Sequence, residues 1–219
     1  AQFLEVARTG VREALAEQEG VGVDLVTDGE QTRDNFYSFV AEKLDGVRLM
    51  TLAEMLEIVE DKQGFQALLD TLDVPAFSIS NPTCVGELRL RESLAVEDLA
   101  YLRSLTDRPI KVTLPGPYLL TRAMWVPEAT GSVYPDKEAL GEAVVGILRE
   151  EVARLAAAGA DFIQLDEPVL TELVFTQGQT RTFMCAALAA RKDPQEELEF
   201  AVGLLARVLQ AAGDTRTGL

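Results

Sequence analysis

AGADFIQLDEP (residues 158–168) is the stretch that indicates the fold of this chain. It begins at the end of an amphipathic run over 136–158, whose apolar residues recur at helical spacing, and Gly159 is placed to end that helix. The apolar stripe consists of Leu140, Val144, Ile147, Leu148, Val152 and Leu155. Residues 161–165 then form a short apolar strand that ends at Asp166-Glu167-Pro168. This order of helix, glycine, strand and polar turn is typical of a parallel βαβ unit.

The same alternation of strand and helix extends through the chain in both directions. Apolar segments at 22–30, 84–90 and 110–114 predict three more strands, the last of them ending in the rigid turn PGP (115–117). Helices are predicted at 1–19, at 51–70 with a break near Gly64, at 95–104, and from a cap at Asp193 to Gly213. The expected buried faces of the first and last helices are Leu4, Ala7, Val11 and Leu15, and Leu198, Val202, Leu205 and Leu209. The sequence therefore predicts an α/β fold with four strands, each followed by a helix.

Polar residues inside the strand at 110–114 bear on whether the sheet is open or closed. Lys111 and Thr113 alternate with apolar residues, and inward-pointing polar side chains of this kind suit a barrel whose lumen leads to a site. An edge strand could carry them as well, so a four-stranded open sheet is the alternative. With 219 residues, the chain is long enough for one core or for part of a larger domain, since (β/α)₈ barrels span roughly 250 residues.

The charge and composition exclude several classes of partner. A net charge of −16 repels phosphate backbones and acidic membrane surfaces, so we expect no nucleic acid and no membrane partner. No apolar run approaches the roughly 20 residues that cross a bilayer, and the first twenty residues mix charges through an amphipathic pattern unlike a secretory signal. We therefore expect a cytoplasmic protein that acts on small molecules.

Histidine and cysteine usage restricts the chemistry further. Histidine is absent, which excludes a Ser-His or Cys-His nucleophile and any His-ligated metal within these residues. Cys84 and Cys185 lie about a hundred residues apart, a spacing that suits neither a disulfide framework nor a metal site. We expect both to be buried as small apolar side chains.

The strand ends supply the candidate site, because ligands of parallel α/β folds bind at the carboxyl ends of strands. One strand ends in Asp28-Gly29-Glu30 and another in Asp166-Glu167-Pro168, so two carboxylates, Glu30 and Asp166, could face one cationic group. Glu167 and Trp125 are weaker candidates for the same pocket. The alternatives are ordinary turns and helix caps, neutralisation by Arg33, or a glycosidase acid pair. No glycine-rich phosphate-binding loop occurs.

Three segments carry a resemblance to a known family. VTDGEQTRDNF (26–36), KVTLPGPYLLTRAMW (111–125) and AGADFIQLDEPVLTE (158–172) resemble the catalytic domain of cobalamin-independent methionine synthase, in order and with comparable spacing. That family has a (β/α)₈ barrel and transfers a methyl group from a methylated folate to the thiol of homocysteine, which a zinc ion holds as thiolate. The resemblance implies that Glu30 and Asp166 hold the ammonium group of homocysteine.

The resemblance also implies what should lie elsewhere. The family's zinc ligands are a His-x-Cys pair, a glutamate and a second cysteine, and neither Cys84 nor Cys185 occupies a matching position. We therefore expect residues 1–219 to be a partial barrel domain of about strands two to five, with the first strand and the zinc-bearing half outside it. The alternatives are a thiol methyltransferase with a corrinoid donor, a decarboxylase of the uroporphyrinogen type, or a binding domain without catalysis.

Overall fold

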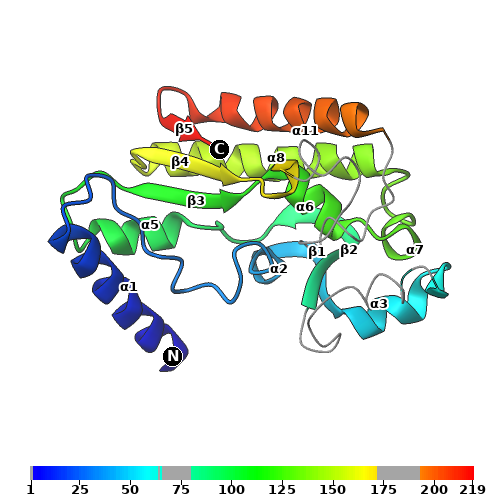
Figure 1. The fold of residues 1–219 in the computed structure, drawn as a ribbon, viewed down its shortest axis with the longest axis horizontal. Coiled ribbons are helices and arrows are strands. Elements are labelled where there is room, and N and C mark those ends of the chain that lie inside the picture. The colour runs from blue at the N-terminus through cyan, green and yellow to red at the C-terminus, as the bar shows by residue number, and fades with distance from the viewer. Residues whose placement is uncertain (1, 64, 66–79, 172–192) are drawn as a thin grey trace.

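The computed structural model describes residues 2–63, 65, 80–171 and 193–219. Figure 1 shows how its helices and strands follow one another. In chain order they are α1 (Gln2–Gly20), α2 (Val40–Lys43), β1 (Leu44–Thr51), α3 (Leu52–Ile58), β2 (Ser80–Leu90), α5 (Val96–Arg103), β3 (Lys111–Pro115), α6 (Pro117–Met124), α7 (Pro127–Thr130), α8 (Lys137–Ala157), β4 (Phe162–Asp166), α11 (Pro194–Leu209), the 3₁₀ turn η1 (Gln210–Ala212) and β5 (Arg216–Gly218). None of the described helices combines the length and apolar character needed to cross a membrane.

A parallel sheet in the order β3-β4-β5 forms the centre of the fold. Pro115 of β3 is level with Asp166 of β4, so the two strands end together. The strand predicted at 22–30 is reduced to a single parallel bridge between Val26 and Ile110, which places the segment after α1 (residues 22–28, the Val26 segment) beside β3 in the same direction. The parallel α/β fold predicted from the sequence is confirmed, and the described strands do not close into a barrel.

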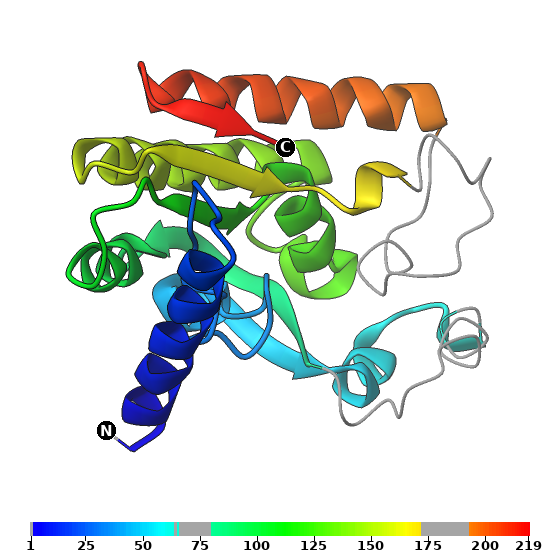
Figure 2. The same ribbon diagram turned by 60° about the vertical axis from the view of Figure 1, so that its left-hand side comes forward.

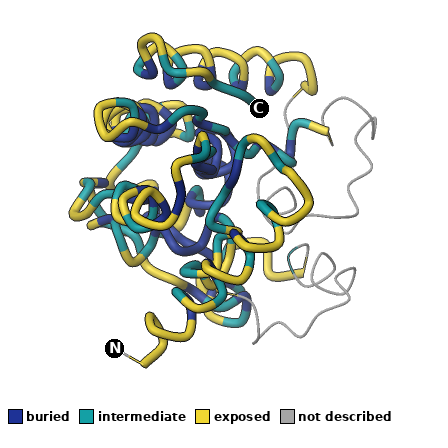
Figure 3. Tube along the Cα trace, turned by 90° about the vertical axis from the view of Figure 1, so that its left-hand side faces the viewer, coloured by how far each residue is buried: buried dark blue, intermediate teal, exposed yellow. Residues whose placement is uncertain are grey.

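The two faces of this sheet differ in character. Helices α8, α11 and α6 pack against one another along one side of it, as Figures 1 and 2 show. Ile163 and Leu165 of β4 are fully buried in one apolar cluster with the stripe of α8, and all six stripe residues predicted for 136–158 are buried. Because side chains alternate along a strand, Gln164 and Asp166 point to the opposite face. Figure 3 shows the buried chain concentrated between the layers.

The strand predicted at 84–90 is present, but the prediction that it belongs to the parallel sheet is wrong. It belongs to β2, which pairs antiparallel with β1 in a separate two-stranded sheet, with Val47 level with Cys84. Strand β1 was not predicted, because LDGVRLMT mixes apolar and charged residues without a continuous apolar run. The fourth parallel segment is instead β5, a strand of three residues at the end of the chain. The β1–β2 pair is thus an insertion in the chain between the Val26 segment and β3.

The helices predicted at 1–19, 95–104, 136–158 and 193–213 are confirmed. The helix predicted at 51–70 begins as α3, which ends already at Ile58, before the expected break near Gly64, and α2, α6 and α7 were not predicted. In α1, Ala7, Val11 and Leu15 are buried as predicted, whereas Leu4 is 43% exposed. In α11 the predicted face is confirmed only in part: Leu205 is buried and Leu209 is partly buried against the core, but the fully buried residues are Glu197, Ala201, Leu204, Leu205 and Val208. Val202 is 52% exposed. The face is rotated because it includes a charged residue, Glu197, that apolar periodicity cannot identify. Gly64 and residues 66–70 of the predicted helix at 51–70 lie outside the described residues, as does Cys185.

Candidate functional site

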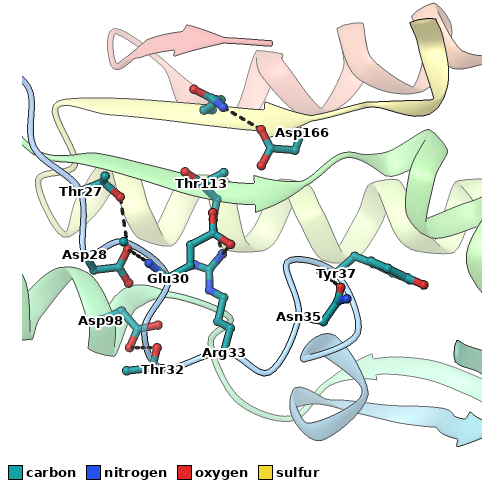
Figure 4. Close-up of polar contacts among 12 residues, drawn as sticks. Thr27, Asp28, Glu30, Thr32, Arg33, Asn35, Tyr37, Asp98, Thr113 and Asp166 are labelled. Atoms are coloured by element: carbon teal, nitrogen blue, oxygen red, sulfur yellow. Dashed lines mark hydrogen bonds and ion pairs between the residues drawn. The ribbon is translucent and has the colours of Figure 1, made fainter. Parts of the chain in front are cut away.

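The candidate site lies where the Val26 segment, β3 and β4 end. In Figure 4 the side chains of Glu30 and Asp166 are both in front of the parallel sheet, while α8 lies behind it. Glu30 follows the Val26 segment, and Asp166 is the last residue of β4. The two sequence candidates are therefore on the polar face of the sheet, at the edge where parallel strands place their ligands.

The backbone at Glu30 has an uncommon conformation. Gly29 and Glu30 have φ angles of 68° and 55°, and Glu30 is the only residue other than glycine with a positive φ in the described chain. The turn is fixed by Asp28, whose Oδ1 accepts hydrogen bonds from the Glu30 N–H (3.1 Å) and from the Thr27 hydroxyl (3.2 Å). A positive φ is uncommon and costly for a residue with a Cβ, and such conformations cluster at functional sites.

The Glu30 side chain is held between cations and other carboxylates. Its Oε2 lies 3.4 Å from Nη1 of Arg33, and it is 28% exposed. Burial raises the pKa of Glu30, and the carboxylates of Asp166 and Asp28 act in the same direction, whereas Arg33 and Lys111 oppose the shift. Asp166 is therefore close enough to Glu30 for its charge to disfavour ionisation of the Glu30 carboxyl. A cation that entered between them would relieve their repulsion.

Asp166 belongs to a row of polar side chains on the same face. Its Oδ1 accepts a hydrogen bond from Nε2 of Gln164 at 2.7 Å, and Oε1 of Gln164 accepts one from Nζ of Lys111 at 3.1 Å. Within the described chain, Asp166 forms no ion pair with an arginine or lysine. Among the described residues, none forms an ion pair with Oδ2 of Asp166, so this oxygen can accept a hydrogen bond from a ligand.

A cavity of about 570 Å³ opens beside Asp166. Its walls are mostly apolar, and Asp166 and Glu167 bring acidic groups to them. The lining residues are Phe36, Asp166, Glu167, Pro168, Leu170, Thr171 and Leu219. Glu30 is not among the residues that line this cavity.

Glu167 has structural contacts that the sequence did not indicate. Its two carboxylate oxygens accept hydrogen bonds from the backbone N–H groups of Tyr118 (2.7 Å) and Leu119 (2.9 Å), which are unpaired donors of the first turn of α6. The side chain lies so close to Gly116 that a Cβ there would collide with it. Burial raises the pKa of Glu167 to about 8. These contacts are those of a helix cap, since both oxygens already have partners.

Trp125 and Cys84 are placed away from the two carboxylates. Trp125 is the C-cap of α6, half-buried against the main apolar cluster, and it does not line the cavity beside Asp166. Cys84 is fully buried, as predicted, and burial raises the pKa of its thiol. No group of three or more acidic, cysteine or histidine side chains in the described ranges could hold a metal ion. The described residues therefore do not fit a zinc site.

Two residues of the site were not assigned to it by the sequence. Gln164 connects Lys111 to Asp166, and Phe36 forms a wall of the cavity. In β4 the polar residues Gln164 and Asp166 alternate with apolar residues, as Lys111 and Thr113 do in β3, and this pattern would have identified Gln164. No local pattern identifies Phe36, because its role depends on how the 30–39 loop folds over the strand ends.

Comparison with known proteins supplies the family. A family model described as the catalytic domain of cobalamin-independent synthase matches residues 1–193. The 5-methyltetrahydropteroyltriglutamate–homocysteine methyltransferase of Streptomyces griseus is 28% identical over 98% of this chain and 26% of its own length. The protein of the same name from Citrobacter koseri is 32% identical over 86% of this chain and 24% of its own length.

Solved structures agree with the sequence comparison. A B12-independent methionine synthase from Shewanella sp. W3-18-1, in complex with selenomethionine, is 26% identical with a TM-score of 0.67, over 99% of this chain and 51% of that one. A structure from Listeria monocytogenes, at 17% identity and a TM-score of 0.64, shows the same fold. The chain thus spans about a quarter of the curated relatives and half of these structures. With 193 of its residues matched by the family model, the chain belongs to the family of cobalamin-independent synthase catalytic domains.

Proposed function

We propose that this chain forms part of a (β/α)₈ barrel that methylates the thiol of homocysteine with a methylated folate as the donor. The Val26 segment, β3, β4 and β5 would be four consecutive strands of that barrel. In this assignment β5 takes the place of the predicted strand at 84–90. The relatives' names support the folate donor over a corrinoid donor, a decarboxylase or a binding domain without catalysis. The observation that carries the proposal is the position of Glu30 and Asp166 on the same face of the parallel sheet, where the Val26 segment and β4 end.

The contribution of these residues is to bind and orient the substrate. Glu30 and Asp166 would each accept a hydrogen bond from the ammonium group of homocysteine, and the apolar wall of the cavity beside Asp166 would contact its methylene chain. Orienting the amino acid in this way fixes the direction of its thiol before the methyl transfer. The family resemblance implies a zinc ion at the thiol, but no set of described residues fits it, so we expect its ligands in other parts of the protein.

Calorimetry of the full-length protein with homocysteine tests this assignment. We expect Glu30→Gln and Asp166→Asn each to weaken binding by roughly 10- to 100-fold, since a charge-assisted hydrogen bond contributes about 1.5–3 kcal/mol. Matched controls are Glu57→Gln and Asp107→Asn, which neutralise exposed carboxylates outside the site and should bind as the unmodified protein does. Unchanged affinity in both site variants would remove the amino-group assignment.

A further inference from the structure

Arg33 is a buried cation at the centre of the candidate site. It lies in the loop after the Val26 segment, yet its side chain is only 4% exposed. Its Nη1 donates a hydrogen bond to the carbonyl oxygen of Thr113 in β3 (2.9 Å), and its Cζ lies 4.5 Å from the centroid of the Phe39 ring. Figure 4 shows the guanidinium directly beside the carboxylate of Glu30. Arg33 therefore ties the loop that carries Glu30 to a rigid strand of the sheet.

The contacts of Arg33 leave room for a second cation at Glu30. The ion pair between Arg33 and Oε2 of Glu30 is long, at 3.4 Å, while the hydrogen bond of the same nitrogen to Thr113 is short. Glu30 also remains 28% exposed, in contrast to Arg33. The Arg33 side chain is thus anchored mainly by the carbonyl oxygen of Thr113 and the ring of Phe39. The Glu30 carboxylate therefore stays partly open to a ligand.

The charges around Glu30 make this anchored cation important. Glu30 is surrounded by the carboxylates of Asp166 and Asp28 and by the cations Arg33 and Lys111. Of the two cations, Arg33 opposes the raised pKa of Glu30 more strongly, and the amine of Lys111 is hydrogen-bonded to Gln164. Without Arg33, three carboxylates would face one another with Lys111 as the remaining cation, and Glu30 would take up a proton more readily.

We propose that Arg33 is a positioning residue for the amino-group site, which holds the Glu30 carboxylate ionised and directed to the space beside Asp166. The inference rests on the proposed function, because it assigns Arg33 to the same ammonium site. An arginine suits the role better than a lysine: its planar guanidinium stacks on Phe39 while its N–H groups reach both a carbonyl and a carboxylate.

The test is the pH dependence of homocysteine binding to the full-length protein, measured by calorimetry in wild type, Arg33→Met and Arg33→Lys. At pH values below both binding midpoints we expect Arg33→Met to bind roughly tenfold more weakly than the wild type, the equivalent of a shift of about one pKa unit at Glu30. Its affinity should recover as the pH rises and Glu30 ionises, so the midpoint of its binding curve moves to higher pH. Arg33→Lys keeps the charge, so its midpoint should remain that of the wild type at a somewhat lower affinity. The titration of homocysteine itself is common to all variants.

A second pair of variants separates positioning from a general structural effect. Arg33 also lies close enough to Asp98 to oppose the raised pKa that burial gives that group, so its removal could act through Asp98. In a Glu30→Gln background we expect Arg33→Met to have no further effect on affinity or on the pH midpoint. An undiminished effect in that background would overturn the proposal.

The remaining outcomes are also decisive. A wild-type pH midpoint in Arg33→Met, together with weak binding by Glu30→Gln, would reject the role of Arg33 and retain the ammonium site. Wild-type binding by both Glu30→Gln and Asp166→Asn would reject the ammonium site, and the role of Arg33 with it. If Arg33→Met fails to fold, judged by thermal unfolding, Arg33→Lys decides: an upward shift of its midpoint would contradict the proposal, because the charge is still present.

Discussion

At the scale of single residues, Glu30 combines a strained backbone with a candidate binding role. Its φ of 55° places a side chain where glycine is usually found, directly after Gly29, which is itself at 68°. The turn is maintained by Asp28, which accepts the N–H of Glu30. Strain that is retained at a position with a carboxylate facing a shared site indicates that the side chain is needed there.

This strain has a measurable consequence. We predict that Glu30→Gly is more stable than Glu30→Ala by about 1 kcal/mol, since only the alanine must bear the cost of a left-handed conformation. Denaturant unfolding of the full-length protein measures the difference. The same pair at Glu150, an exposed helical position in α8, should show the opposite order, because glycine costs about 1 kcal/mol relative to alanine inside a helix. If alanine is the more stable residue at both positions, the backbone of Glu30 is not strained.

Glu167 provides a second prediction at this scale, which concerns pH. Burial raises the pKa of Glu167 from 4.5 to about 8, so between these values the folded protein binds a proton that the unfolded chain releases. Stability attributable to this group is therefore full at acidic pH and declines as the pH rises to 8, with a slope of at most about 1.4 kcal/mol per pH unit. Glu167→Gln should remove that part of the slope in unfolding experiments. An identical slope in wild type and variant would contradict the raised pKa.

At the scale of elements, the helix layer behind the sheet is joined by one buried charge cluster. Glu197 of α11, only 3% exposed, pairs with Arg122 of α6 at 3.2 Å and with Lys137 of α8. It also accepts a hydrogen bond from the hydroxyl of Tyr118 at 2.8 Å. Burial opposes ionisation of Glu197, but its hydrogen bonds to Lys137 and Tyr118 and the charge of Arg122 keep its pKa low. The cluster therefore fixes the position of three helices relative to one another.

Removing the carboxylate from this cluster should be strongly destabilising. Glu197→Ala removes the buried carboxylate that pairs with both Arg122 and Lys137, which we expect to cost about 3–5 kcal/mol of unfolding free energy. The control is Glu199→Ala, an exposed residue of the same helix, with an expected change within about 0.5 kcal/mol. Chemical denaturation compares the two. A loss below 1 kcal/mol for Glu197→Ala, about that of a surface ion pair, would contradict the role assigned to the cluster.

The elements that the sequence predicted are those with strong local patterns. The stripe of α8 and the apolar runs of β3 and β4 were identified because helix and buried strand differ in period and length. β1 and β5 were not, since one has no apolar run and the other has three residues. The partner of β2 is fixed by contacts distant in sequence, and so is the face of α11, where Glu197 is buried only because Arg122 and Lys137 lie opposite.

At the scale of the whole molecule, parallel strands bring residues that are distant in sequence to one edge. Glu30 and Asp166 could be selected from the sequence because that rule depends on strand direction alone. The anchoring of Arg33 on Thr113 and the capping of α6 by Glu167 could not, because each depends on the distance between loops in the folded chain. The sequence thus predicted that Glu30 and Asp166 follow parallel strand ends, but not the contacts of the loops around them.

The edges of the parallel sheet lead to a prediction about the isolated polypeptide. Among the described strands, β5 pairs only with β4, so its other side offers unpaired backbone groups. We expect a polypeptide of residues 1–219 alone to self-associate, because exposed strand edges pair with other chains. Size-exclusion chromatography with light scattering measures this. A monodisperse, stable monomer would show that the edge is protected in some other way.

Discrimination between homocysteine and 4-sulfanylbutanoate, the same thiol acid without its amino group, tests the ammonium site most directly. The full-length protein should bind homocysteine roughly tenfold or more tightly than the analogue, as expected for charge-assisted hydrogen bonds to two carboxylates. In Glu30→Gln combined with Asp166→Asn, this preference should disappear, while the affinity for the analogue stays nearly constant. An equal preference in the unmodified protein and the double variant would show that the two carboxylates do not bind the amino group.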